Sequence, residues 1–107
     1  MAGLLDLNPP FQQAVSAYGQ GRLDEAETLC RRAVKRQPAH VGALHLLGVI
    51  HLRKRNPARA IEAFDRLLKL QPNSPDVLNN RAMALFDVGQ KDKALAGLDS
   101  ALAIRAW

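Results

Sequence analysis

Three histidines and one cysteine are the first candidates for catalytic or metal chemistry in this chain of 107 residues. His40, His45 and His51 lie five and six residues apart, so no two of them share a helix face as a metal-binding pair at i and i+4 would. No carboxylate or second cysteine completes a metal site with them. We therefore expect structural or surface histidines and no metal.

Cys30 has no His or Lys beside it in the sequence, and it falls on the apolar face of an expected helix. A small thiol packs there like Ala or Val and is not activated as a nucleophile. As the only cysteine it cannot form an internal disulfide, and the sequence contains no glycine-rich phosphate loop. We expect no catalysis by this chain and no cofactor.

The composition is that of one helical domain. Hydrophobic residues make up 48% of the chain and aromatic residues only 5%, which favours packed helices over a β-sandwich. No apolar run approaches the roughly 20 residues of a membrane span. The segment from Met1 to Pro10 has neither the basic start nor the hydrophobic run of a signal peptide. We expect a cytoplasmic protein without membrane contact.

An internal repeat organises the elements that must position any site. Shifting the sequence by 34 residues aligns Ala26, Ala60 and Ala94. The same period aligns further small, apolar and turn residues: Ala14 with Gly48 and Ala82, Ala33 with Leu67 and Ala101, Pro38 with Pro72, Leu44 with Leu78, and Gly21 with Gly89. Small side chains allow helices to approach closely, and Gly and Pro serve turns.

Each period predicts two helices of about 10 to 15 residues, separated by Pro and Gly breakers. Asn8, Asn56 and Ser74 each precede a proline, so each can cap a helix whose first residue is that proline. The second helix of the middle period has apolar residues at spacings of three and four: Ala60, Ile61, Phe64, Leu67 and Leu68. This face is wide enough to pack on its partner and on the next pair.

These residues resemble the tetratricopeptide repeat (TPR) family, which is built of 34-residue helix-turn-helix units. The middle unit matches at Leu44, Leu47, Gly48, Ala60, Phe64 and Pro72; the third keeps Leu78, Ala82, Gly89, Ala94 and Ala101; the first keeps Gly21, Ala26, Ala33 and Pro38 but has Cys30 in place of Phe64. The resemblance implies an all-α fold, a right-handed α-solenoid of antiparallel helix pairs. A single domain, residues 1–107, would hold repeats at approximately 7–40, 41–74 and 75–107.

The resemblance also implies that the first helix of each pair lines an inner groove, while the second helices form the outer surface. Family geometry places three sets of residues in that groove: Phe11, Gln12, Val15 and Tyr18; His45, Val49, Leu52 and Arg53; and Asn79, Asn80, Met83 and Phe86. An apolar floor with amide and cationic groups suits a bound peptide. For Val15, Val49 and Met83, a place in the core is the open alternative.

Two binding modes of the family can be compared position by position. Repeats that clamp the acidic tail of heat-shock chaperones use Lys, Asn and Arg, because a terminal carboxylate needs charge-assisted donors. The matching positions here hold Phe11, Val15, Leu46, Asp76 and Asn80, so chaperone-tail capture is not expected. The asparagine ladder of O-linked N-acetylglucosamine transferase is matched at Asn80, approximated at Gln12 and broken at Leu46.

The formal charge of +5 lies mostly in residues 41–74, which hold six basic and two acidic residues. Helical spacing scatters the basic residues over more than one face, as on a solvated surface. Helical-repeat RNA readers use particular side chains in successive units, whereas the matching positions here change from Phe11 to His45 to Asn79. We do not expect a nucleic-acid partner.

The final helix lacks the polar outer face that usually closes a solenoid. Leu98, Leu102 and Ile104 are expected to form an exposed apolar stripe on it, and Ala106 stands where earlier units have Pro. Either this chain is the front end of a longer protein, or another copy covers its open end. The stripe would be an association site in both cases.

The sequence supports three hypotheses for function. The first is a binding module that holds a peptide segment of a partner protein in the inner groove. The second is an assembly protein, a homo-oligomer that associates through Leu98, Leu102 and Ile104. The third is the recognition arm of a longer enzyme, such as a glycosyltransferase, with catalysis encoded beyond Trp107.

Overall fold

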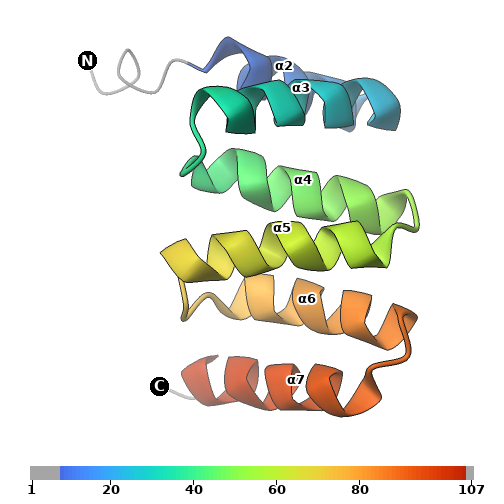
Figure 1. Ribbon diagram of the computed structural model, residues 1–107, viewed down its shortest axis with the longest axis vertical. Helices are drawn as coiled ribbons and strands as arrows, with labels where there is room; N and C mark the ends of the chain where they lie inside the picture. Colours follow the sequence, from blue (N-terminus) through green and yellow to red (C-terminus); the bar gives the residue numbers. More distant parts are fainter. Residues whose placement is uncertain (1–7, 106–107) are drawn as a thin grey trace.

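The chain folds into a stack of antiparallel helices (Figure 1). The computed structural model describes residues 8–105, which form six α-helices and no strand. The helices are α2 (Pro9–Gly19), α3 (Leu23–Arg36), α4 (Val41–Arg53), α5 (Pro57–Leu70), α6 (Pro75–Asp87) and α7 (Lys91–Arg105). The pairs α2–α3, α4–α5 and α6–α7 follow the predicted periods. This arrangement confirms the predicted all-α solenoid of helix pairs.

The stack has two different sides. Each helix packs on the next one in the chain, and in addition α2 contacts α4 and α4 contacts α6. Among the described residues, no Cα atoms of α3 and α5, or of α5 and α7, come within 8 Å of each other. The first helices of the pairs are therefore closer together than the second helices. We call the side formed by α2, α4 and α6 concave, and the side formed by α3, α5 and α7 convex.

Recurring small residues let the paired helices approach. Ala26, Ala60 and Ala94 are each 0% exposed. At Gly48, an added Cβ would lie 2.4 Å from Cε1 of Phe64, so α4 and α5 need glycine at this position. Phe64 is the largest fully buried side chain. Cys30, at the matching position of the first repeat, is also 0% exposed, and its burial raises the pKa of the thiol to about 12.

The helix starts agree only partly with the predicted caps. The Asn8 side chain accepts a hydrogen bond from the Phe11 N–H at 3.3 Å, as predicted. Asn56 and Ser74 make no side-chain cap, so the prediction is wrong there; the following prolines begin α5 and α6 with their fixed φ. An unpredicted cap is His40, whose Nδ1 accepts from the Ala43 N–H at 3.0 Å.

The turn within each pair places one residue in the left-handed region of the backbone. These residues are Gly21 (φ 78°), Arg55 (φ 61°) and Gly89 (φ 81°), spaced by the repeat period. Only Arg55 carries a side chain there, which is sterically unfavourable. We expect Arg55→Gly to raise the free energy of unfolding by about 1 kcal/mol. Urea denaturation of the purified chain would measure the change.

The matched control is Gly89→Ala, which puts a Cβ at the equivalent position and should lower the free energy of unfolding by about 1 kcal/mol. Arg55→Ala separates the effect of backbone strain from the effect of the guanidinium side chain, because alanine keeps the Cβ atom and removes the rest of the side chain. A gain from Arg55→Ala equal to that from Arg55→Gly would contradict the explanation by backbone strain.

Candidate peptide-binding groove

Three large apolar side chains, which we call the apolar row, are exposed on the helices that form the concave side. Val15 of α2 is 48% exposed, and Met83 and Phe86 of α6 are 58% and 41% exposed. Val15 and Met83 are therefore surface residues rather than core residues. On α4, which lies between α2 and α6, Val49 and Leu52 are half-buried and pack against the core. The middle of the row therefore exposes less apolar surface than its two ends.

At one end of the predicted groove, Phe11 of α2 packs against His40 and Gly42 at the start of α4. Its ring lies 4.6 Å, between centroids, from the ring of His40. A Cβ at Gly42 would lie 2.9 Å from its Cζ, so glycine makes room for the aromatic ring. Gln12 beside it is exposed. His40 was not predicted from the sequence as part of this end. His40 lies one repeat period before Ser74, which was predicted to cap a helix, so the same position could have been predicted as a helix start here.

At the other end, Arg53 lies over the ring of Tyr18. The distance from its Cζ to the ring centroid is 5.2 Å, which is a cation–π contact between α4 and α2. The contact limits the rotamers of two long side chains on the concave side. Both residues were predicted for the groove, and the structure brings them together.

A polar contact joins the second and third repeats. Asn80 Nδ2 lies 3.4 Å from Nε2 of His45, whose ring meets Phe64 edge-on at 6.4 Å between centroids. With His45 as acceptor, the carboxamide oxygen of Asn80 can accept a hydrogen bond from a ligand. Asn79, the other predicted amide, is half-buried.

The apolar residues of the last helix differ from the predicted stripe. Leu98 packs against Ala82, Leu85 and Ala94, and Ile104 is half-buried. Only Leu102, at 67%, is strongly exposed among the three predicted residues, and Leu95 is 47% exposed on the same helix. The prediction overlooked that α7 needs Leu98 to close its contact with α6. Ala106 lies outside the described residues.

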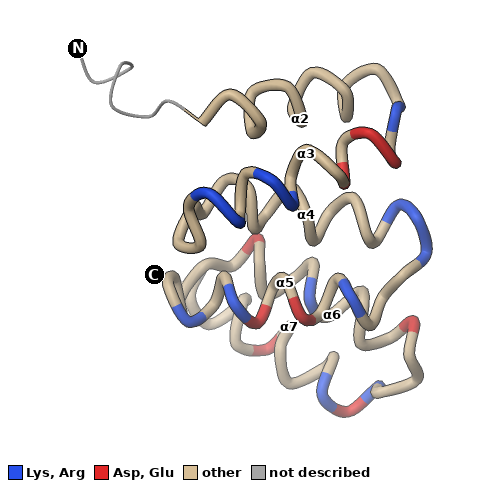
Figure 2. Tube along the Cα trace, turned by 45° about the horizontal axis from the view of Figure 1, so that its top comes forward, with Lys and Arg blue, Asp and Glu red and all other residues tan. Residues whose placement is uncertain are grey.

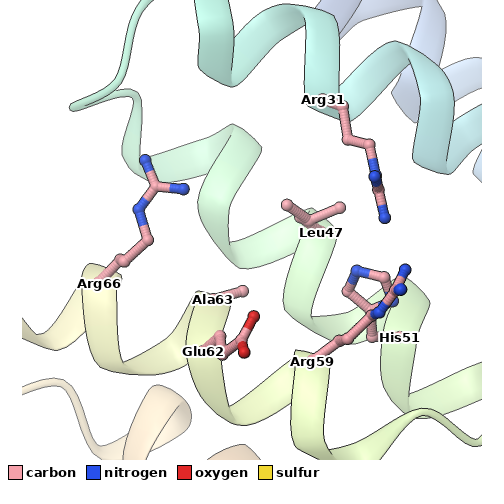
Figure 3. A pocket seen from close by; sticks show the side chains of 7 residues that line it. All are labelled: Arg31, Leu47, His51, Arg59, Glu62, Ala63 and Arg66. Atoms are coloured by element: carbon pink, nitrogen blue, oxygen red, sulfur yellow. The ribbon is translucent and has the colours of Figure 1, made fainter.

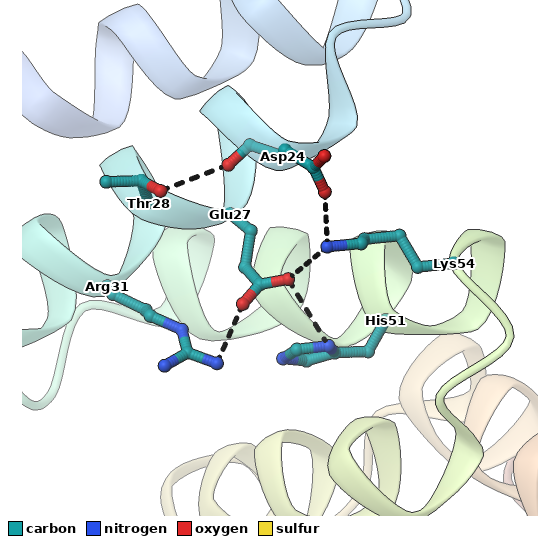
Figure 4. Close-up of polar contacts among 6 residues, drawn as sticks. All are labelled: Asp24, Glu27, Thr28, Arg31, His51 and Lys54. Atoms are coloured by element: carbon teal, nitrogen blue, oxygen red, sulfur yellow. Dashed lines mark hydrogen bonds and ion pairs between the residues drawn. The ribbon is translucent and has the colours of Figure 1, made fainter.

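The main electrostatic cluster lies outside the groove, between α3 and α4 (Figure 4). Glu27 binds Arg31 at 2.7 Å and Lys54 at 2.8 Å, and Lys54 also reaches Asp24. The hydrogen bond from Lys54 is the main reason that the pKa of Glu27 is lowered. Burial lowers the pKa of nearby His51, whose Nδ1 lies 4.0 Å from Glu27 Oε1.

Neither a one-sided charged surface (Figure 2) nor a metal-binding cluster is seen in the described part of the chain. Lys and Arg segments are spread over several helices and turns and alternate with Asp and Glu segments (Figure 2). Among the described residues, no three His, Cys, Asp or Glu side chains gather closely enough to hold a metal ion. None of the helices from α2 to α7 is long and apolar enough to cross a bilayer.

The stacked pairs, their small contact residues and their two unlike sides define a helical-repeat protein. A tetratricopeptide repeat model matches residues 11–75, and a second one matches residues 47–106. The chain belongs to the tetratricopeptide repeat family.

Curated relatives share parts of their length with this chain. Protein O-mannosyl-transferase TMTC1 of Mus musculus is 25% identical over 95% of this chain, which covers 12% of that protein. The peroxisomal targeting signal receptor of Yarrowia lipolytica is 31% identical over 90% of this chain, which covers 16% of the receptor. The chain thus spans less than a fifth of either relative.

Solved structures share the fold. A crystal structure of MamA superposes with a TM-score of 0.86 at 18% identity, over 91% of this chain and 57% of MamA. The first TPR of Spaghetti (RPAP3), bound to an HSP90 peptide, gives a TM-score of 0.84 at 16% identity, over 89% of this chain and 75% of that one. At these identities the likeness concerns the fold alone.

Proposed function

We propose that this chain is a protein-interaction module that binds an extended peptide segment of a partner protein on its concave side. The observation that carries the proposal is the exposed apolar row of Val15, Met83 and Phe86 on helices that face the same side. Exposed apolar side chains in a row give a peptide places to bury alternate side chains. The partner is then any protein that presents a segment with suitably spaced apolar side chains.

Polar groups beside the row suit the backbone of the peptide. Asn80 is held by His45, so its carboxamide is already oriented before a ligand binds. Such preorganisation lowers the entropy lost on binding. Tyr18 is likewise held by Arg53 at the opposite end. Together they mark the two ends of the surface that we assign to the ligand.

The proposed ligand differs from an acidic chaperone tail. The Spaghetti (RPAP3) structure contains an HSP90 peptide, and its fold is shared by this chain. At the clamp positions, however, this chain has Phe11, Val15, Leu46, Asp76 and Asn80, which include no cation and one carboxylate. We therefore expect selection by apolar side chains rather than by a terminal carboxylate.

Selection from a random peptide library, followed by fluorescence anisotropy with an enriched peptide, tests the proposal. We expect Asn80→Ala and Phe86→Ala each to weaken binding about tenfold, and Tyr18→Ala to weaken it as well. Matched controls are Asn73→Ala and Leu70→Ala, which remove the same kinds of side chain from exposed positions outside the first helices. Wild-type affinity in folded Asn80→Ala and Phe86→Ala variants would count against the groove.

A second candidate is self-association through α7, supported by the exposure of Leu95 and Leu102. Light scattering over a concentration series tests it, and a strict monomer at high concentration would remove it. The likeness to TMTC1 supports the third hypothesis, a recognition arm of a longer glycosyltransferase, in which this chain itself carries no catalysis. A cytoplasmic location stays a prediction.

A further inference from the structure

A cleft opens on the convex side, where α3 and α5 do not touch. It has a volume of about 470 Å³, and α4 forms its floor with Leu47 and His51 (Figure 3). Its rim carries Arg31 from α3, and Arg59, Glu62 and Arg66 from α5. The cleft exists because the second helices of adjacent pairs are spread apart, and it lies on the opposite side from the groove discussed above.

The rim is positively charged. Its three arginines and one glutamate leave an excess of two positive charges. Arg31 is oriented by its ion pair with Glu27 at 2.7 Å. Among the described residues, no ion pair or hydrogen bond engages the guanidinium groups of Arg59 and Arg66. Their planar sets of N–H donors are thus available, and such donors match the oxygens of phosphates and carboxylates.

His51 gives the cleft a polar group at its base. The side chain is only 3% exposed, and its Nδ1 has no hydrogen-bond partner. Nδ1 faces Glu27 Oε1 at 4.0 Å, so the ring nitrogen available to a ligand is Nε2, which points away from Glu27 (Figure 4). In Figure 3 the imidazole lies beside Arg59 and below the guanidinium of Arg31.

We propose that the convex cleft is an oxyanion-binding site, in which Arg31 and Arg59 bind a phosphate or carboxylate group, the His51 ring donates to it from below, and Arg66 adds positive charge from the opposite side of the cleft (Figure 3). The volume is within the usual range for small-ligand pockets, so the anionic group of a larger molecule fits. Glu62 opposes binding and limits the site to ligands with enough negative charge. The proposal does not depend on the concave groove.

An anion bound in the cleft is expected to change the pKa of His51. Charged groups face this ring from three directions: Glu27 and Arg31 from α3, Lys54 from the residue directly after α4, and Arg59 from α5. Burial and the cations keep the pKa of the imidazole below its ordinary value, despite Glu27. A bound anion stabilises the imidazolium, so it must raise that pKa. Binding is therefore expected to take up a proton and to strengthen as the pH falls.

NMR titration of the full chain at constant ionic strength tests the site, with sulfate, inorganic phosphate and acetate as separate probes. We expect saturable shifts in the His51 ring and in the arginine Nε–H signals, and a raised pKa of His51 in sulfate, which does not itself titrate in this range. Arg59→Gln/Arg66→Gln should weaken binding about tenfold or more. Glu62→Gln should strengthen it.

Lys91→Gln/Lys93→Gln is the matched control, because it removes two positive charges from exposed positions of α7. Binding in this variant should equal wild type. Phosphate bound more tightly than acetate assigns the cleft to phosphate esters, and the reverse preference assigns it to carboxylates. The proposal is overturned by the absence of saturation at millimolar probe, by equal losses in the two double variants, or by an unchanged pKa of His51. None of these outcomes affects the peptide-binding assay.

Discussion

Phe64→Ala is expected to lower the free energy of unfolding by about 3–5 kcal/mol. The ring is 0% exposed and lies in a cluster that includes Ala33 of the first repeat, Leu44 of the second and Val77 of the third. Removing it leaves a cavity where three repeats meet. A loss of this size is a large fraction of the stability of a domain this small. Chemical denaturation would measure it.

Phe86→Ala is the matched control for this prediction. It deletes the same atoms from a ring that is 41% exposed on the concave side, so much less apolar contact is lost. We expect its effect on the free energy of unfolding to be about 1 kcal/mol or less. Similar losses in both variants would contradict the assignment of Phe64 to the core and Phe86 to the surface.

Gly48→Ala is expected to lower the free energy of unfolding by about 2–3 kcal/mol. The new Cβ would lie 2.4 Å, 2.7 Å and 2.8 Å from three atoms of the Phe64 ring, so the helices or the ring must move. The ring is fully buried in a cluster of core side chains, so its movement disturbs their packing. Alanine favours a helix over glycine by about 1 kcal/mol, so overpacking must exceed this gain. Thermal and urea denaturation would measure the net loss.

Gly97→Ala tests the same exchange in a helix without the clash. An added Cβ there meets only Ala82 Cβ and Leu78 O, both at 3.9 Å, which is ordinary contact. This variant should be stabilised by about 0.5–1 kcal/mol through helix propensity. Combining Gly48→Ala with Phe64→Leu should cost less than the sum of the single changes. Exact additivity would show that the clash with Phe64 is not the cause.

The two proposed sites use different parts of the repeat. The groove uses side chains of the first helices, which touch one another along the concave side. The cleft uses the space between second helices, which the curvature of the stack separates. One chain can therefore hold a peptide on one side and an anionic group on the other, and separate variants address each side.

Sequence reasoning succeeded best where a residue is constrained by its own repeat. Ala26, Ala60 and Ala94 recur because two helices of a pair meet there, and all three are fully buried. The capping prediction was less successful, since only Asn8 caps as expected. A side-chain cap forms only if the capping residue can adopt a rotamer that reaches the first N–H groups of the helix. Proline can begin a helix without such a hydrogen bond. The groove residues remain predictions as ligand contacts, although the structure does show contacts between Tyr18 and Arg53 and between His45 and Asn80.

The 34-residue period by itself predicted the helix pairs, and the resemblance to the tetratricopeptide repeat family implied the side on which a groove should lie. Local packing requires the same small residue in each repeat, and that requirement is visible in one sequence. Only the tertiary structure decided which residues of nonadjacent helices meet. Arg31, His51 and Arg59 have no common spacing, and their shared cleft depends on how far α3 lies from α5. That separation comes from the curvature of the whole stack, to which every contact between repeats contributes.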